Sequence, residues 1–439
     1  MIKSATSVIA LSCYAFALSG CIGGPITKPP GIVCGDLLPL YEPLDPTVGG
    51  ETLLDKTIAA KRAASNGGPI VINILTLSGG GKYGAFGAGF LGGWSEAEAN
   101  GGIVPLSREE IDIITGVSTG ALLSSYAAAG NLSPTQGGSA ALRAEADADA
   151  KAGYEVSDSG LFKSKGMLGL LTSNGLADPS GRLDKRVADM VTEYAPHVAK
   201  SPSDHMVLVG AANLTNGKFY VADLTEAAKK GPEANACYAE WLLASSAVPA
   251  QFPPRFIDGY GYVDGGVRFG AFLSNNVARV VRRTKAPGDE LEGTQVKINL
   301  IALFNNPLTA NSPSQNPDAA VACDQSTLAN AKDVCPARKN NLLAVATRSA
   351  GDIMTNQVYL DSVYRLHRDL DASGILGISH FIYAPPQKIA EKGCKAATED
   401  HFDRAFMDCL YSLGFEMAQD PEQWLSFEEM PRSRSAADR

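Results

Sequence analysis

Gly116-Val117-Ser118-Thr119-Gly120 is the stretch of this sequence that decides the fold. The apolar run 111–115 directly precedes it and is typical of a short buried strand, whereas residues 121–129 are good helix formers that end at Gly130. A Gly-x-Ser-x-Gly pattern between a strand and a helix is typical of a nucleophile elbow, where the serine lies on a sharp turn. The two glycines lack the Cβ atoms that would collide there. We therefore predict that Ser118 is a catalytic serine, with a plain structural turn as the alternative.

The composition is that of an ordinary globular protein. The chain has 439 residues, of which 45% are hydrophobic and 19% charged, so apolar material for a large core is present. The formal net charge is −9 and the basic residues do not cluster, which argues against nucleic acid as a partner.

Apolar segments alternate with helical segments, which predicts an α/β fold with a mostly parallel central sheet flanked by helices. Residues 69–77 are almost continuously apolar, as in a strand that is covered on both faces. Asn216-Gly217 between two apolar segments predicts a β-hairpin. Further strands are expected at 111–115, 206–212, 218–222, 296–304 and 380–383, and a short aromatic strand is expected before Asp264. Helices are expected at 52–65, 85–91, 121–129, 183–194, 236–247, 341–370 and 402–418.

The N-terminus predicts export. A short apolar run, 7–18, follows Lys3 and is too brief for a typical transmembrane helix. It ends in Leu18-Ser19-Gly20-Cys21, which resembles the lipobox of bacterial lipoproteins, and this resemblance implies that Cys21 carries lipid and anchors the protein to a membrane. The alternative is an ordinary signal peptide with a chance cysteine. Ile22 in place of aspartate favours the outer membrane of the bacterial cell envelope.

We interpret the chain as one catalytic domain with flanking segments. The expected division is a signal peptide at 1–20, a tether at 21–50, the catalytic domain at 51–420 and a C-terminal tail at 421–439.

Six cysteines remain when Cys13 and Cys21 are set aside, and an even number in an exported protein suggests disulfides. Short loops favour the pairs Cys323–Cys335 and Cys394–Cys409, which leaves Cys34 to pair with Cys237. Other connectivities stay open. No Cys-x-x-Cys or His-x-x-x-His spacing occurs, so we expect no metal.

Two further segments carry groups that a catalytic serine needs. Gly79-Gly80-Gly81 lies ahead of a helix and could direct backbone amides at one point, where they would stabilise an oxyanion. A tight turn or a phosphate-binding loop is the alternative, although no Gly-Lys-Ser/Thr sequence completes a P-loop. Asp264 in Asp264-Gly265-Gly266 could act as the base if burial raises its pKa; as a bare motif, the segment is a hairpin turn.

Together these segments resemble the patatin-like phospholipase family. The resemblance covers about 71–272 and rests on three motifs in the correct order: Ser78-Gly79-Gly80-Gly81 with 84–89, Gly116–Gly120, and Asp264-Gly265-Gly266. The segment 244–254 also resembles the family's segment before the aspartate.

The resemblance implies that Ser118 is the nucleophile and Asp264 its dyad partner. It implies an oxyanion hole formed by the amides of Gly79, Gly80 and Gly81. It assigns supporting roles in the motifs to Gly116, Gly120, Gly265 and Gly266. Members of the family cleave acyl esters of phospholipids and other lipids through an acyl-enzyme, without metal or cofactor. We therefore expect a lipid or ester substrate.

Two positions depart from the family pattern. Ser78 stands where many members have aspartate, and Tyr83 stands where arginine is common. Lys82 either compensates for that arginine or is a solvated surface lysine.

Two other interpretations stay open. An α/β-hydrolase-type esterase with a Ser-His-Asp triad would use one of three histidines that follow Asp264, namely His367, His380 or His401. A lipoprotein that binds lipid without turnover would need no base at all.

Overall fold

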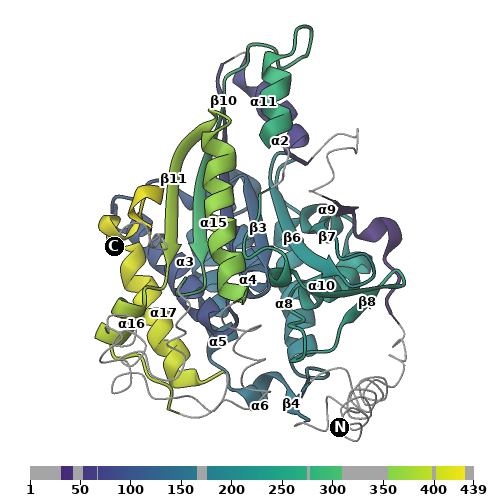
Figure 1. The fold of residues 1–439 in the computed structure, drawn as a ribbon, viewed down its shortest axis with the longest axis vertical. Coiled ribbons are helices and arrows are strands. Elements are labelled where there is room, and N and C mark those ends of the chain that lie inside the picture. Colours follow the sequence, from purple (N-terminus) through teal and green to yellow (C-terminus); the bar gives the residue numbers. More distant parts are fainter. Residues whose placement is uncertain are drawn as a thin grey trace, which may run out of the picture.

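The computed structural model describes residues 31–42, 53–66, 68–165, 176–273, 277–308, 354–397 and 402–430. Within these residues the central sheet has nine strands in the order β1-β7-β6-β3-β2-β10-β11, with β9 paired to β6 and β8 to β9 (Figure 1). The strands are β1 Leu40–Tyr41, β2 Ile70–Leu77, β3 Ile113–Val117, β6 Met206–Asn213, β7 Phe219–Asp223, β8 Arg255–Ile257, β9 Tyr260–Asp264, β10 Val296–Phe304 and β11 Leu376–Tyr383.

The middle of the sheet is parallel. Strands β6, β3, β2, β10 and β11 pair in parallel, whereas β7, β9, β1 and β8 add antiparallel pairs beside β6. The predicted α/β fold is therefore confirmed, and so is the hairpin at Asn216-Gly217, which joins β6 to β7. A separate two-stranded sheet consists of β4 Lys163–Ser164 and β5 Ala177–Asp178.

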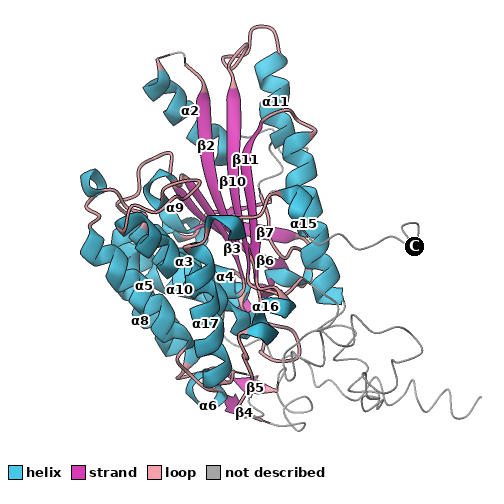
Figure 2. Cartoon of the chain, turned by 90° about the vertical axis from the view of Figure 1, so that its left-hand side faces the viewer, coloured by secondary structure: helices cyan, strands magenta, loops and turns pink. Residues whose placement is uncertain are grey.

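Helices cover both faces of the sheet (Figure 2). Seen edge-on, α3, α4, α5, α8, α10 and α17 lie on one side, and α15 lies on the other. The helix bounds are α2 Leu53–Ser65, α3 Gly84–Ala99, α4 Thr119–Gly130, α5 Ala140–Tyr154, α6 Asp158–Leu161, α8 Leu183–Val198, α9 Leu224–Lys229, α10 Asn235–Ser245, α11 Val277–Lys285, α15 Thr355–Asp371, α16 Pro386–Glu391 and α17 Arg404–Ala418.

The strands divide their apolar side chains between two cores. In β2, Ile72 and Ile74 pack into the core under α15, whereas Leu75 and Leu77 pack into the core under α3 and α4. Because successive side chains of a strand point to opposite faces, a continuous apolar run fills both cores. No described helix is long and apolar enough to span a membrane.

Two flanking segments belong to the domain, contrary to the expected division of the chain. Within the predicted tether, β1 pairs with β7 and Ile32 bridges to Ile257. Within the predicted tail, Trp424 is buried and the Leu425 carbonyl accepts the Phe381 amide at 2.8 Å. The folded domain therefore includes residues 31–42 and 421–430, in addition to the expected core.

Two of the three predicted disulfides are present, Cys34–Cys237 and Cys394–Cys409. The other predicted pair, Cys323–Cys335, lies outside the described residues, as do the predicted signal peptide, Cys21 and the segment 341–353 of the predicted long helix.

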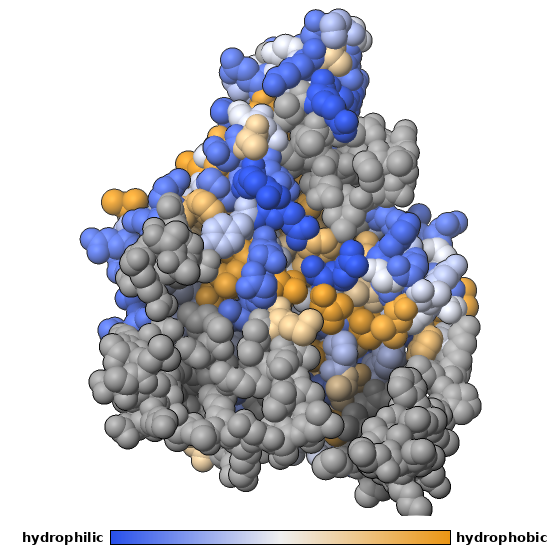
Figure 3. Space-filling model, viewed as in Figure 1, coloured by the Kyte–Doolittle hydropathy of each residue, from blue (hydrophilic) through white to orange (hydrophobic). Residues whose placement is uncertain are grey.

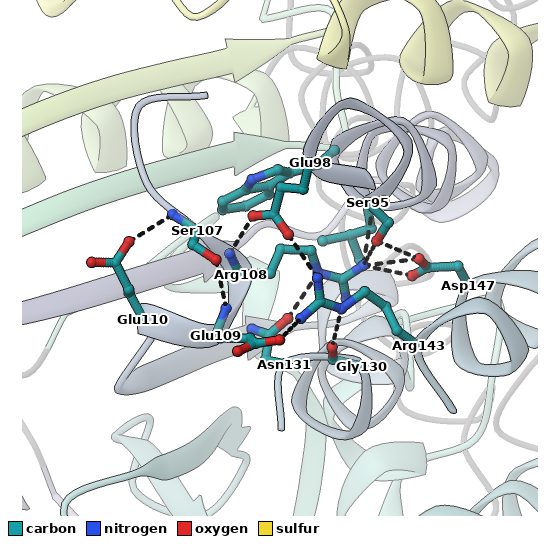
Figure 4. A network of polar contacts seen from close by, with 12 residues as sticks. Ser95, Glu98, Ser107, Arg108, Glu109, Glu110, Gly130, Asn131, Arg143 and Asp147 are labelled. Carbon is teal, nitrogen blue, oxygen red and sulfur yellow. Dashed lines mark hydrogen bonds and ion pairs between the residues drawn. The ribbon is translucent and has the colours of Figure 1, made fainter. Parts of the chain in front are cut away.

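A buried polar network ties α3, α4 and α5 together (Figure 4). Arg108 is fully buried, and its Nη1 atom donates to Asp147 at 2.7 Å and to Ser95 Oγ at 2.6 Å. Arg143 on α5 donates to Glu98 on α3 at 2.7 Å and to the carbonyl of Gly130, the last residue of α4, at 2.8 Å. Since α4 carries the serine elbow at its N-terminus, this network holds the helix that follows Ser118 against its neighbours.

Candidate active site

Ser118 lies between β3 and α4 on a strained turn. Its backbone has φ 55° and ψ −124°, a conformation that residues other than glycine rarely adopt. The Ser118 amide donates to Ser245 Oγ at 3.0 Å, and Ser245 in turn donates to the Gly210 carbonyl at 2.6 Å. These bonds hold the turn from α10 and β6, which lie far from it in sequence.

The two glycines of the elbow are required because a side chain at either position would collide with neighbouring backbone atoms. A Cβ on Gly120 would lie 2.2 Å from the Leu77 carbonyl oxygen, and a Cβ on Gly116 would lie 2.6 Å from the Gly120 carbonyl oxygen. Both neighbours are backbone atoms that have little freedom to move. The strand–turn–helix arrangement inferred from the sequence is therefore present, with the serine on its bend.

Strand β6 brings Asp264 to Ser118. Val117 pairs with Gly210 of β6, and the next residue of β6, Ala211, pairs with Asp264 of β9. Because the two registers are adjacent, the end of β9 lies beside the elbow. The Ser118 side chain lies next to the Asp264 carboxylate and lowers its pKa.

The Asp264 carboxylate is buried and has few partners. Only 5% of the residue is exposed, and its Oδ1 atom accepts the Gly266 amide at 2.7 Å. Burial raises the pKa of Asp264 from 3.8 to about 6, although the Ser118 side chain and the Gly266 amide oppose this rise. Gly265 and Gly266 begin the short 3-10 turn Gly265–Val267, so the Asp-Gly-Gly segment is a turn that also presents a carboxylate.

The glycine loop follows β2 and reaches the same end of the sheet. Gly80 and Gly81 both have positive φ, 154° and 55°. The Gly79 amide donates to the Gly270 carbonyl at 3.3 Å, whereas no acceptor for the Gly80 or Gly81 amide occurs in the described part of the chain. Of the three predicted oxyanion donors, Gly80 and Gly81 thus have available amides, while the Gly79 amide is already engaged.

Asn305 positions the glycine loop, and no sequence motif marks this residue. Its amide donates to Ser78 Oγ at 2.8 Å, and its Nδ2 atom donates to the Ser78 carbonyl at 2.7 Å. A Cβ on Gly80 would lie 1.5 Å from the Asn305 carbonyl oxygen. The sequence offered one signal: Asn305 directly follows β10, which runs parallel to β2, so both carboxyl ends meet at one edge.

Lys82 and Tyr83 pack against α17. Lys82 is only 7% exposed and its ammonium lies 5.3 Å from the centre of the Phe406 ring, so it is not a solvated surface lysine. The Tyr83 ring meets the same ring edge-on at 5.7 Å.

The two described histidines that follow Asp264 in the sequence contact aromatic and backbone groups away from Ser118 and Asp264. His367 stacks on Phe427 with ring centres 3.7 Å apart, and the His380 Nδ1 atom lies 2.7 Å from the Trp424 carbonyl oxygen. Neither ring is among the groups that perturb the pKa of Asp264. His401 lies outside the described residues.

Three side chains of the types that bind metal ions lie together at the start of β3, whereas Ser118 follows the other end of this strand. They are Asp112, Asp204 and His205. The Lys61 ammonium lies 2.8 Å from Asp112 Oδ1, so this carboxylate already has a cation as its partner.

Comparison with known proteins agrees with this arrangement. A family model described as Patatin-like phospholipase matches residues 75–280, which include the glycine loop, the serine elbow and Asp264. The chain carries a patatin-like phospholipase domain. This confirms the resemblance inferred from the motifs, and the patatin-like phospholipase family supports lipid acyl hydrolase activity in general terms.

Other comparisons add little to the patatin-like phospholipase match. Among solved structures, the chain is similar to one titled "Crystal structure of VipD from Legionella pneumophila", with 10% sequence identity and a TM-score of 0.33. The similarity covers 80% of this chain and 66% of that chain. No curated protein matches the sequence significantly.

Proposed function

We propose that this protein is a lipid acyl hydrolase that cleaves carboxylic esters with Ser118 as the nucleophile and Asp264 as the base. The observation that carries the proposal is that strand pairing places the Ser118 hydroxyl beside a buried carboxylate whose pKa is raised to about 6. A carboxylate with such a pKa is ionised at neutral pH, yet accepts a proton more readily than an exposed aspartate.

Acylation begins when Asp264 takes the proton of the Ser118 hydroxyl. The Ser118 oxygen then attacks the ester carbonyl carbon, and the negative charge that forms on the carbonyl oxygen is stabilised by the amides of Gly80 and Gly81. As the tetrahedral intermediate collapses, protonated Asp264 gives its proton to the departing alcohol. The acyl group remains on Ser118.

Deacylation repeats these steps with water. Asp264 takes a proton from water, the water oxygen attacks the acyl carbon, and the proton returns to the Ser118 oxygen as the fatty acid departs. One carboxylate thus acts as base and acid in both halves of the reaction.

A lipid substrate is supported by apolar surface beside these residues. Val248 follows Ala247, whose carbonyl accepts the Asp264 amide at 3.0 Å, and Val267 lies in the turn after Asp264; their exposed fractions are 36% and 46%. Apolar side chains also gather on either side of the lower end of α15 (Figure 3). Such a surface suits acyl chains better than it suits a small polar ester.

The triad alternative has less support. Among the described histidines, none contacts Ser118 or Asp264, and a Ser-His-Asp mechanism would need an imidazole between them.

Membrane attachment through lipid on Cys21 is also part of the proposal, with the outer membrane of a bacterial envelope as the site. The supporting observation is the lipobox-like sequence before Cys21. Metabolic labelling with an alkyne-tagged fatty acid should mark the wild-type chain, and Cys21→Ser should remove the label. Equal labelling of the two chains contradicts this attachment.

The decisive experiment combines covalent labelling with turnover. We expect a fluorophosphonate probe to label Ser118 in the purified protein, and phospholipids, lysophospholipids or simple esters to be hydrolysed. Ser118→Ala should lose both activities, whereas Ser412→Ala, which changes an exposed serine on α17, should keep both. Hydrolysis by the Ser118→Ala protein, or wild-type protein that neither labels nor hydrolyses any ester, would refute the proposal.

A further inference from the structure

Tyr359 on α15 reaches the site from the opposite face of the sheet. Only 3% of the residue is exposed, and it packs in the core under α15. The turn after Asp264 is fixed to this helix, because the Gly270 amide donates to Ser362 Oγ at 3.0 Å. The Gly270 carbonyl in turn accepts the Gly79 amide. Helix α15, the Asp264 turn and the glycine loop are therefore joined at one point.

Two glycines, Gly79 and Gly270, make room for the Tyr359 side chain, and the Cβ position of Gly266 lies at ordinary contact distance from its hydroxyl. A Cβ on Gly270 would lie 2.6 Å from Tyr359 Cγ, and a Cβ on Gly79 would lie 2.1 Å from the Tyr359 hydroxyl oxygen. A Cβ on Gly266 would lie 3.5 Å from the same oxygen. The ring thus occupies a slot between the glycine loop and the Asp264 turn.

The same glycines place the hydroxyl beside the reacting groups. The Cβ position of Gly79 lies 3.0 Å from Ser118 Cβ, and the Cβ position of Gly266 lies 2.9 Å from Asp264 Oδ1. The Tyr359 hydroxyl therefore faces Ser118 across Gly79 and faces Asp264 across Gly266.

The Tyr359 hydroxyl remains protonated. Burial and the nearby Asp264 charge hold the pKa of Tyr359 well above its ordinary value of 10. A neutral phenol can donate one hydrogen bond and accept another. Tyr359 therefore cannot serve as a base, but it can hold a water molecule.

The reaction cycle needs such a group after acylation. In the free enzyme, the Asp264 carboxylate accepts the Gly266 amide and has the Ser118 hydroxyl beside it. Once Ser118 carries the acyl group, its oxygen has no hydrogen to donate, and a water must take its place beside Asp264. A buried water needs two or more polar partners, of which Asp264 supplies one.

We propose that Tyr359 is a further catalytic residue whose hydroxyl, together with Asp264, holds the water that hydrolyses the acyl-enzyme. This inference rests on the proposed ester hydrolysis. In the step, an O–H bond of the water breaks and its proton passes to Asp264, while the water oxygen bonds to the acyl carbon. The bond between that carbon and Ser118 Oγ then breaks, and Asp264 returns the proton to Ser118. Tyr359 orients the water and gains or loses no proton overall.

Tyr359→Phe tests the proposal because it keeps the ring in its slot and removes only the oxygen. With a p-nitrophenyl ester, we expect steady-state turnover to fall roughly tenfold or more. A rapid burst of about one equivalent of p-nitrophenol should appear, because acylation proceeds while deacylation is slow. Mass spectrometry after an acid quench should find the acyl group on Ser118. The rate of fluorophosphonate labelling, which reports attack by Ser118 alone, should stay within about threefold of the wild-type rate.

Tyr383→Phe is the matched control, since Tyr383 is another buried tyrosine of the same core and lies on the edge strand β11. It should show neither the burst nor the slow turnover. If Tyr359→Phe turns over at the wild-type rate, or if its turnover and labelling fall in equal proportion, the role in deacylation is wrong while the Ser118–Asp264 mechanism stands. A wild-type protein without any labelling or turnover refutes the proposed function, and this inference falls with it.

Discussion

Replacing Asp264 by asparagine removes a charge that folding has buried, and we expect this change to stabilise the protein while it abolishes ester hydrolysis. Asparagine has nearly the same shape, and its oxygen can still accept the Gly266 amide. Its NH₂ group can donate to the Ser118 oxygen. The main difference is therefore the cost of keeping an ionised carboxylate out of water.

The pKa of Asp264 sets the size of this effect. It rises from 3.8 to about 6 on folding, and each pKa unit corresponds to about 1.4 kcal/mol, which gives an upper limit of about 3 kcal/mol. Because the folded pKa is raised, the folded protein binds the proton more tightly than the unfolded chain does. The stabilising contribution of this group is fully present below pH 3.8 and is lost as the pH rises through about 6.

Chemical denaturation, followed by tryptophan fluorescence between pH 4 and pH 8, measures the difference. Asp264→Asn should be more stable than wild type by up to about 3 kcal/mol at pH 8, and by less than about 1 kcal/mol at pH 4. Asp371→Asn, at the exposed end of α15, should differ from wild type by no more than about 0.5 kcal/mol at either pH. An Asp264→Asn protein that is less stable than wild type at pH 8, or a difference that does not change with pH, would contradict this reasoning.

Three further changes follow from the elbow and its support. Ser118→Gly should be more stable than Ser118→Ala by about 1 kcal/mol in denaturation experiments, because glycine adopts φ 55° without strain; equal stability would show that the turn stores no strain. Gly120→Ala should lower stability by about 1–3 kcal/mol and abolish fluorophosphonate labelling, since its Cβ would press on the Leu77 carbonyl; normal labelling would mean that the turn can shift. Arg108→Ala leaves the buried Asp147 carboxylate without its cation, so the free energy of unfolding should fall by about 3–5 kcal/mol, and a loss below about 1 kcal/mol would contradict that account.

Local sequence predicted those elements that long apolar runs define. The expected strand at 296–304 matches β10 residue for residue, and the expected strand at 69–77 differs from β2 by one residue. The strand before the elbow extends to Val117, two residues beyond the predicted end, because the turn begins only at Ser118. Helix α5 was missed, since its many alanines and charged residues show only a weak apolar stripe.

The proposed nucleophile and base, Ser118 and Asp264, could be singled out from the sequence because glycine-rich motifs surround them, whereas the residues that support them could not. Asn305 bonds to Ser78 across 227 positions, and Tyr359 reaches Gly79 from a helix on the other face of the sheet. Neither residue lies in a recognisable motif. Their positions depend on strand pairing and helix packing, which residue patterns alone do not specify. The engagement of the Gly79 amide by Gly270 has the same origin.

The attachment of residues 32–35 to the β8–β9 hairpin limits how far the domain can stand from a lipid anchor. The Ile32 amide donates to the Phe256 carbonyl, and Cys34, two residues later, is joined to Cys237 by a disulfide. If Cys21 carries lipid, only about ten residues separate it from this fixed point, and that length of chain spans at most roughly 35 Å. The domain would then stay within about that distance of its own bilayer, so it could hydrolyse only esters that come within this distance of the membrane surface.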